Sequence, residues 1–295
     1  MYLVVLIITV FILSKKGTPS SQPSPLPDLP WNLWEVALVF IVIEWVQHLV
    51  TDGFAAVAGA KARELGEILS FPVPFAGLCI FFFFSLGPQR TINVFGLNHR
   101  SGDLQILFGV RWTLLYLTSV LIFVIGILGG EGLSQGKLFQ TAQRQWEVWG
   151  WSGFLRQFLA EVLAGSTLEE FMFRGLLYAT IRQKISMWPA ILITSIVFML
   201  AHGINSYGMF FIGIFLCLLV EKSHSLLPSI AAHISHNFLV SALTIPLILS
   251  VPSSIYVYFL GIGLLGIVGI CFIEVWIRKR RNLSLRWDFV WSVPR

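Results

Sequence analysis

The chain has 295 residues, of which 56% are hydrophobic and only 12% are charged, and its mean hydropathy is +0.79. Soluble domains are typically about 45–50% apolar and about 25% charged, so the composition excludes an ordinary soluble domain and indicates an integral membrane protein. The net charge of +5 is not a nucleic-acid signal, because Lys and Arg gather at the ends of apolar segments, where they set membrane topology. We therefore expect membrane lipid as a partner, and no nucleic acid.

The N-terminal part of the chain, residues 1–30, combines a short apolar segment with a polar one. Met1–Leu13 is apolar, but its positive charges, Lys15 and Lys16, follow it, whereas a secretory signal peptide carries them first. We therefore interpret this segment as an N-terminal anchor or a fragment of one. Gly17–Pro30 is rich in Pro and Ser, which favours an extended linker.

Eight apolar segments follow the linker, and we expect each to form a helix. Backbone exposed to lipid must make its hydrogen bonds within a helix or a closed barrel, and no segment alternates as barrel strands do. The predicted fold is therefore an all-α, polytopic transmembrane bundle of about eight helices. It comprises N-terminal helices in residues 31–150, a core in residues 151–277 and a basic tail in residues 278–295. The predicted segments are Trp31–Val50, Ile68–Leu86, Leu104–Gly129, Ser152–Ile181, Pro189–His202, Met209–Val220, Leu226–Leu249 and Ile255–Ile277.

Positive charges predict how the bundle is oriented. Four basic residues, 278–281, follow the last apolar segment, which predicts a cytoplasmic C-terminus. The loop Thr51–Glu67 is predicted outside and carries Lys61 and Arg63 as an exception; part of it, Lys61–Ile68, has the pattern of a short interfacial helix. The other basic residues predicted on the cytoplasmic side are Lys15, Lys16, Arg90, Arg100, Arg182, Lys184 and Lys222.

The stretch "STLEEFMFRG" places three ionisable residues inside an apolar segment, and such residues are expensive in lipid and usually functional. Glu170 and Arg174 are four residues apart and share a helix face, so they are expected to form an ion pair. Glu169 is turned about 100° away and lacks that arginine, which suits it to act as a general base or acid. The alternative is that both acids are structural.

Two further motifs follow on separate predicted helices. Phe198 and His202 are one turn apart, and His233 and Asn237 share a helix face, whereas His236 points elsewhere. Two side-chain donors on one face can stabilise an oxygen that gains negative charge. Taken singly, each motif is equally compatible with a hydrogen-bonded contact between helices.

Other ionisable residues in apolar segments have simpler expected roles. Glu44 and His48 are four residues apart and are expected to pair on the helix surface. Glu274 precedes Arg278 by the same interval and is expected to pair with it at the membrane boundary.

The three motifs can lie at one depth in the membrane. Glu169 is about 20 Å from Arg182 at roughly 1.5 Å per residue, His202 is about as far from the start of its segment, and His233 is roughly 10 Å from Leu226. A carboxylate, two imidazoles and an amide, without an activated Ser or Cys, indicate hydrolysis by water. Because water is a reactant, the site must face a wet cavity, which we expect to open to the cytoplasm.

The ordered set Glu169-Glu170-x-x-x-Arg174, Phe198-x-x-x-His202 and His233-x-x-x-Asn237 resembles the CPBP family. Its members include type II CAAX prenyl endopeptidases, which are glutamate-dependent intramembrane proteases, and bacterial proteins linked to bacteriocin processing or self-immunity. The resemblance covers about residues 150–245. It implies an eight-helix core that opens to the cytosol and an intramembrane endopeptidase acting on a membrane-associated peptide or lipidated protein. Glu169 and His202 would activate water, His233 and Asn237 would form the oxyanion hole, and Glu170 and Arg174 would support them.

Two alternatives remain at this point. Glu169, His202 and His233 could bind zinc as one oxygen and two nitrogens, although the sequence has no His-Glu-x-x-His motif; our expectation is that no cofactor is needed. In the second alternative the protein is a non-catalytic bacteriocin self-immunity or transport protein, whose buried charges bind a proton or an ion.

Overall fold

The computed structural model describes residues 29–97, 102–134, 158–203, 206–248 and 255–281, and every regular element in these ranges is a helix. The prediction of an all-α fold is therefore confirmed. The predicted anchor Met1–Leu13 and most of the linker and of the basic tail lie outside these ranges. The helices are α2 (Leu33–Leu69), α3 (Pro72–Leu86), α4 (Pro88–Val94), α5 (Gly102–Ser134), η1 (Phe158–Gly165), α7 (Ser166–Glu169), η2 (Glu170–Tyr178), α8 (Ala179–Arg182), α9 (Met187–Ala201), α10 (Tyr207–Ser223), α11 (Leu227–Ile248) and α12 (Ile255–Arg280).

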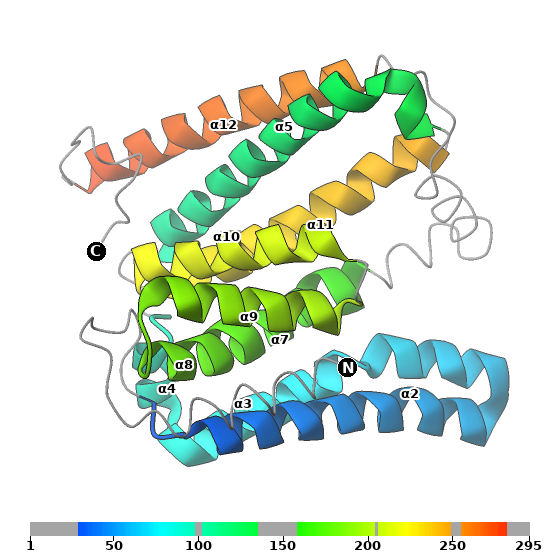
Figure 1. Cartoon of the computed structure of the whole chain (residues 1–295), viewed down its shortest axis with the longest axis vertical. Helices are drawn as coiled ribbons and strands as arrows, with labels where there is room; N and C mark the ends of the chain where they lie inside the picture. Colours follow the sequence, from blue (N-terminus) through cyan, green and yellow to red (C-terminus); the bar gives the residue numbers. More distant parts are fainter. Residues whose placement is uncertain (1–28, 98–101, 135–157, 204–205, 249–254, 282–295) are drawn as a thin grey trace.

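The helices stack side by side with their axes along one general direction (Figure 1). The consecutive segments η1, α7, η2 and α8 occupy the middle of the stack, in contact with α9, α10 and α11. On one side of them lie α2 and α3, and on the other side α5 packs against both α11 and α12. The chain region with the three motifs therefore forms the centre of the described structure.

Local sequence explains where the first helices begin and end. The Asn32 side chain accepts hydrogen bonds from the backbone N–H groups of Trp34 and Glu35, and the Glu35 carboxylate accepts one from the N–H of Asn32. This reciprocal capping box starts α2. Between α3 and α4 the chain turns by 104° at Gly87, whose φ of +75° is open to glycine and strained for other residues.

Two local predictions differ from the structure. The predicted outer loop Thr51–Glu67 is helical, because α2 continues without a break to Leu69. The stretch contains five Ala, the strongest helix former, so its charged residues do not interrupt the helix. The short helix α4 was not predicted. It follows the bend at Gly87 and has Pro88 in its first turn.

Among the described residues, fewer helices are long and apolar enough to cross a membrane than the sequence predicts. Within them, Leu33–Gly53 is long and apolar enough to cross a membrane, and α3 with α4 passes the same test as one bent pair. Met187–Ala201 is a shorter apolar helix. The number of crossings therefore stays a prediction.

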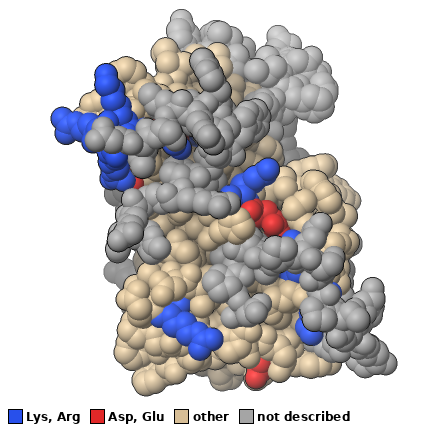
Figure 2. All heavy atoms as spheres, turned by 90° about the vertical axis from the view of Figure 1, so that its left-hand side faces the viewer, with Lys and Arg blue, Asp and Glu red and all other residues tan. Residues whose placement is uncertain are grey.

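One end of the stack is basic. It contains α4, the end of α8, the start of α9 and the ends of α10 and α12, and it lies on the left in Figure 1. Figure 2 views this end directly and shows more Lys and Arg than Asp and Glu among the described residues. Trp188 and Trp276 are about half exposed there, and Trp276 packs under the Arg280 guanidinium at 4.4 Å. The exposed basic residues of this end, called the basic end below, are Arg90, Lys222, Lys279, Arg280 and Arg281.

Candidate active site

Glu169 and Glu170 lie where the central helix changes its winding. The helical run from Phe158 to Arg182 is continuous, but η1 and η2 are π-helical and enclose the single α-helical turn of α7. π-Helical turns are rare and occur frequently at functional sites. Glu169 ends α7 and Glu170 begins η2, so the predicted catalytic acid sits at the junction between two helix geometries.

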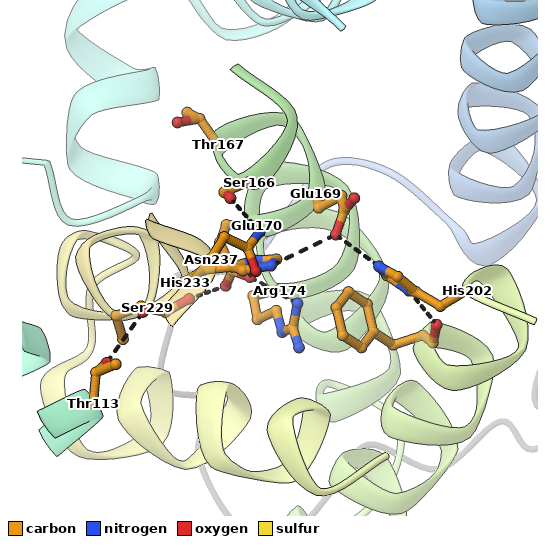
Figure 3. A network of polar contacts seen from close by, with 12 residues as sticks. Thr113, Ser166, Thr167, Glu169, Glu170, Arg174, His202, Ser229, His233 and Asn237 are labelled. Atoms are coloured by element: carbon orange, nitrogen blue, oxygen red, sulfur yellow. Dashed lines mark hydrogen bonds and ion pairs between the residues drawn. The ribbon is translucent and has the colours of Figure 1, made fainter. Parts of the chain in front are cut away.

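Glu169 faces two imidazoles, one from α11 and one from the end of α9 (Figure 3). Its Oε2 atom lies 3.6 Å from Nε2 of His202 and 3.8 Å from Nε2 of His233. The same oxygen has no hydrogen-bond partner among the described residues. These separations are too long for direct hydrogen bonds.

The other nitrogen of each imidazole is already committed. Nδ1 of His202 lies 3.0 Å from the Phe198 carbonyl oxygen, and Nδ1 of His233 lies 2.8 Å from Oε1 of Glu170. A carbonyl and a carboxylate only accept hydrogen bonds, so each Nδ1 carries the hydrogen. In the neutral rings both Nε2 atoms therefore present a lone pair toward Glu169.

Glu170 has a different environment from its neighbour. Its carboxylate is fully buried and accepts hydrogen bonds from Arg174 at 2.7 Å, from His233 at 2.8 Å and from the Ser229 hydroxyl. The predicted Glu170–Arg174 ion pair is thus confirmed, with both side chains fully buried. The carboxylate also joins η2 to α11 and orients His233, a role that helical spacing did not predict.

Phe198 packs against the buried Arg174 and both imidazoles. Its ring is fully buried, lies 4.3 Å from the Arg174 guanidinium carbon, and has its centroid 4.5 Å from that of His202 and 5.9 Å from that of His233. A guanidinium over an aromatic face is stabilised by the ring quadrupole, so this contact compensates part of the cost of burying the arginine.

Asn237 is held by a serine that sequence reasoning missed. Its side-chain nitrogen donates to the Ser166 hydroxyl at 2.9 Å, and Ser166 is buried. Ser166 is three residues before Glu169 on α7, so this bond ties the predicted oxyanion amide to the catalytic helix. Thr113 of α5 donates to the Ala232 carbonyl of α11 at 3.1 Å and holds α11 from the other side.

The structure brings all six predicted site residues into one cluster, and it leaves the other candidates outside. His236 is buried against Tyr116, with ring centroids 6.2 Å apart, as its predicted orientation requires. Glu44 and His48 form the expected pair at 3.5 Å on the helix surface. Glu274 forms a buried ion pair with Arg111 of α5, a partner that spacing along the chain did not predict.

The donor chemistry of the cluster is compatible with a metal in kind but not in geometry. Two imidazole nitrogens and a carboxylate oxygen are typical zinc ligands, and orienting partners on the second ring nitrogen are usual for ligating histidines. Among the described residues, however, no three His, Cys, Asp or Glu side chains converge closely enough to hold a metal ion.

Comparison with known proteins bears on the same region of the chain. The family model described as type II CAAX prenyl endopeptidase Rce1-like matches residues 151–239, a range that contains all three motifs. Searches of curated proteins and of solved structures found no match. Members of the matched family are integral membrane proteins and intramembrane proteases. The match confirms the resemblance inferred from the motifs over these residues: this part of the chain is similar to the CPBP family.

Proposed function

We propose that this protein is an intramembrane endopeptidase in which Glu169, assisted by His202, activates water to hydrolyse a peptide bond of a membrane-associated substrate. The observation that carries the proposal is the convergence of one carboxylate oxygen and two Nε2 atoms at 3.6 and 3.8 Å, with both Nδ1 atoms engaged elsewhere. The similarity of residues 151–239 to type II CAAX prenyl endopeptidases supports a protease. The substrate is a peptide or a lipidated protein that reaches the site from the bilayer.

In the proposed reaction Glu169 takes a proton from water while the water oxygen attacks the peptide carbonyl carbon. His202 orients the same water through its Nε2 lone pair. When the tetrahedral intermediate collapses, the C–N bond breaks and Glu169 returns the proton to the leaving amine. The products are a carboxylic acid and an amine. One water molecule is consumed, and Glu169 returns to its starting state.

The oxyanion of the intermediate would be stabilised from α11. Asn237 gives one N–H to Ser166, and the second N–H of its amide is available for the carbonyl oxygen. His233 would donate from Nε2 when that atom is protonated. Preorganised donors of this kind commonly contribute about 10²–10³ in rate.

The decisive test compares Glu169→Gln with Glu161→Gln. Glu161 is an exposed acid on η1, in the same central helix and outside the cluster, so it controls for the loss of one negative charge. Purified full-length protein in lipid vesicles is assayed with internally quenched peptides, with and without a C-terminal prenyl group, and with native membrane extracts read by mass spectrometry. We expect Glu169→Gln to abolish hydrolysis and Glu161→Gln to keep it.

Residual cleavage by a folded Glu169→Gln protein would refute the proposed chemistry. A Glu169→Gln protein with an unchanged biological effect would instead favour the non-catalytic self-immunity or transport function.

We further propose that the reaction needs no metal, so treatment with EDTA or phenanthroline should leave the rate unchanged. The proposal is supported by the described residues, among which no group of three His, Cys, Asp or Glu side chains forms a metal site. Loss of activity on chelation, with recovery on adding Zn²⁺ and stoichiometric zinc by elemental analysis, would contradict it.

The proposed membrane orientation of the bundle rests on the distribution of basic residues, as it does in the sequence analysis. The basic end is proposed to lie at the cytoplasmic surface, because Lys and Arg are retained on that side. The exposed Trp188 and Trp276 at the same end support this placement, since Trp is enriched at membrane–water interfaces. The C-terminus, which follows α12 at the basic end, would then be cytoplasmic.

A further inference from the structure

We propose that Ser229 is a positioning residue for His233: its hydroxyl holds one oxygen of the Glu170 carboxylate, so that the other oxygen stays on the imidazole. This role rests on the proposed function for the claim that the His233 ring serves hydrolysis. Three features of the structure support it. They are the division of donors between the two carboxylate oxygens, the burial of the groups involved and the unused donors of Arg174.

The two oxygens of the Glu170 carboxylate have different partners (Figure 3). Oε1 lies 2.7 Å from Nη1 of Arg174 and 2.8 Å from Nδ1 of His233. Oε2 accepts the hydrogen bond of the Ser229 hydroxyl. Because a carboxylate is planar, holding Oε2 in one place also fixes the direction in which Oε1 points. Ser229 therefore sets the position of the acceptor to which the His233 ring is bound.

The bond of Ser229 belongs to a regular contact between α11 and the central helix. Ser229, His233 and Asn237 are spaced by four residues on α11, so they share one helix face. On the central helix, Ser166 and Glu170 have the same spacing. The two faces meet in three hydrogen bonds: Ser229 and His233 bind the carboxylate, and Asn237 binds the serine. The three bonds together place both predicted oxyanion groups.

Bulk water does not reach the Ser229 hydroxyl or its acceptor. Ser229 and Glu170 are fully buried, and His233 is only 2% exposed. A buried acceptor that loses its donor keeps the full cost of having left water. Removing the hydroxyl therefore leaves Oε2 without a partner in a closed position, and the carboxylate is driven toward another donor.

Arg174 supplies donors that compete for this oxygen. Its Nη1 already binds Oε1, and its Nε and Nη2 have no hydrogen-bond partner among the described residues. Arginine frequently holds both oxygens of a carboxylate in a bidentate pair, and the terminal torsion of a glutamate is broad. Without Ser229, the Glu170 carboxylate turns toward the guanidinium and Oε1 leaves Nδ1 of His233. The ring then loses the bond that aims its Nε2 at Glu169, which lies 3.8 Å away.

The test separates the hydroxyl of Ser229 from the volume of its side chain. Ser229→Thr keeps a hydroxyl, and Ser229→Val has nearly the same shape as that variant without the donor. Ser229→Ala removes the donor and adds no volume, so it serves where the larger side chains do not fit. Ser235→Ala is the matched control, because this serine lies on the same helix and outside the cluster. All variants are made in the full-length chain, and thermal unfolding shows which of them fold.

The first measurement does not use hydrolysis. The protein is labelled with ¹⁵N-histidine, and the Nδ1–H proton of His233 is followed by NMR in detergent, where His233→Gln identifies its signal. A ring bound to a buried carboxylate gives a downfield, slowly exchanging proton. We expect this signal in the wild type and in Ser229→Thr and Ser235→Ala, and its loss or upfield shift in Ser229→Val and Ser229→Ala. An unchanged signal in folded Ser229→Ala would overturn the inference.

The second measurement is the rate of hydrolysis. In Ser229→Val and Ser229→Ala, kcat should fall about tenfold, a factor of the order of one hydrogen bond to a charged group. KM should stay unchanged, because His233 is proposed to act on the intermediate and not on the bound substrate, and Ser229→Thr should recover most of kcat. Wild-type kcat in Ser229→Ala would contradict the role of Ser229. A wild-type protein that shows the NMR pattern but hydrolyses no peptide would contradict the proposed function and still support the positioning of the ring.

Discussion

At the scale of residues, the adjacent Glu169 and Glu170 have different environments, and we expect them to have different roles. Glu170 is fully buried and accepts three hydrogen bonds, so its charge is balanced inside the protein. Glu169 is partly exposed, has no arginine, and faces the unengaged nitrogens of two imidazoles. A carboxylate whose lone pairs are filled by buried donors is poorly suited to take a proton from water. We therefore expect the proposed reaction to use Glu169, and Glu170 to stabilise the fold.

The substitution Glu170→Gln should destabilise the protein strongly. It leaves the Arg174 guanidinium fully buried without a carboxylate, and breaking a buried ion pair in this way costs about 3–5 kcal/mol. Glu169→Gln, next to it, should change the free energy of unfolding by less than about 1 kcal/mol. Thermal unfolding of both variants in detergent gives the comparison, and equal midpoints would contradict the division of roles.

Ser166 is predicted to act as a positioning residue for Asn237. Ser166→Ala removes the acceptor of the Asn237 amide, and one neutral hydrogen bond is worth about 1 kcal/mol, so kcat/KM should fall about fivefold. Most of the loss should appear in kcat, because the amide acts on the intermediate. Thr167→Ala is the matched control: its hydroxyl bonds only to the Leu163 carbonyl within the same helix, and it should leave both constants unchanged. An unaffected Ser166→Ala protein would show that the bond does not orient the amide.

At the scale of elements, α11 carries His233, Asn237 and Ser229, so its distance from the neighbouring helices sets the site. α5 approaches α11 closely at Gly109, where an added Cβ would lie 2.1 Å from the Pro228 carbonyl oxygen. That oxygen belongs to backbone and cannot rotate away. Glycine at this position therefore allows α5 and α11 to touch through their backbones.

Gly109→Ala should move α11 and cost about 1–3 kcal/mol, the usual range for overpacking a closed interface. Hydrolysis should fall with it, because a shift of α11 changes the distance from His233 to Glu169. Gly208→Ala, at a helical glycine with nothing within 4 Å of an added Cβ, should cost no stability. Thermal unfolding and kcat are measured for both variants. A stable, fully active Gly109→Ala protein would mean that the interface between α5 and α11 can accommodate a methyl group.

Hydropathy and helical spacing predicted most elements of the described fold, because each depends on local sequence. The central helix ends within one residue of its predicted bound, and α9, α10, α11 and α12 lie within a few residues of theirs; the predicted start at Ser152 lies outside the described residues. The misses are places where local sequence is ambiguous. The polar stretch Thr51–Glu67 has good helix formers as well as charges, and the bend at Gly87 depends on one dihedral angle. Nothing in residues 158–178 distinguishes π-helical from α-helical turns.

The sequence predicted which residues belong to the candidate site, but it did not predict the hydrogen bonds between helices that hold them. Spacing along single helices paired Glu170 with Arg174 and His233 with Asn237, and the order of the motifs indicated the family. The bonds of Ser229 and His233 to Glu170, and of Asn237 to Ser166, run between helices. Their partners are remote in sequence, and serines are common in apolar helices, so no local pattern marks them.

At the scale of the whole molecule, two ion pairs tie the last helix to α5. Arg111 and Glu274 form a buried ion pair. Asp103 and Arg281 form a second ion pair at the basic end, with hydrogen bonds of 2.7 and 3.0 Å. The second pair is about half exposed, and exposed pairs contribute only about 0–1 kcal/mol. The buried pair therefore matters more for holding α12 against α5, which in turn contacts α11 and through it the site.

Removing one member of the buried pair should loosen this side of the bundle. Glu274→Gln leaves the Arg111 charge in a fully buried position, at a cost of about 3–5 kcal/mol. Adding Arg111→Met removes that charge while keeping most of the volume, and replacing both members of a buried pair by apolar or neutral groups is often close to neutral. The double variant should therefore recover most of the lost thermal stability. If the double variant is as unstable as the single one, the pair acts through its hydrogen bonds and not through its charge. Hydrolysis should follow stability in both proteins, because α12 packs on α5 and α5 packs on α11, which carries His233 and Asn237 of the proposed site.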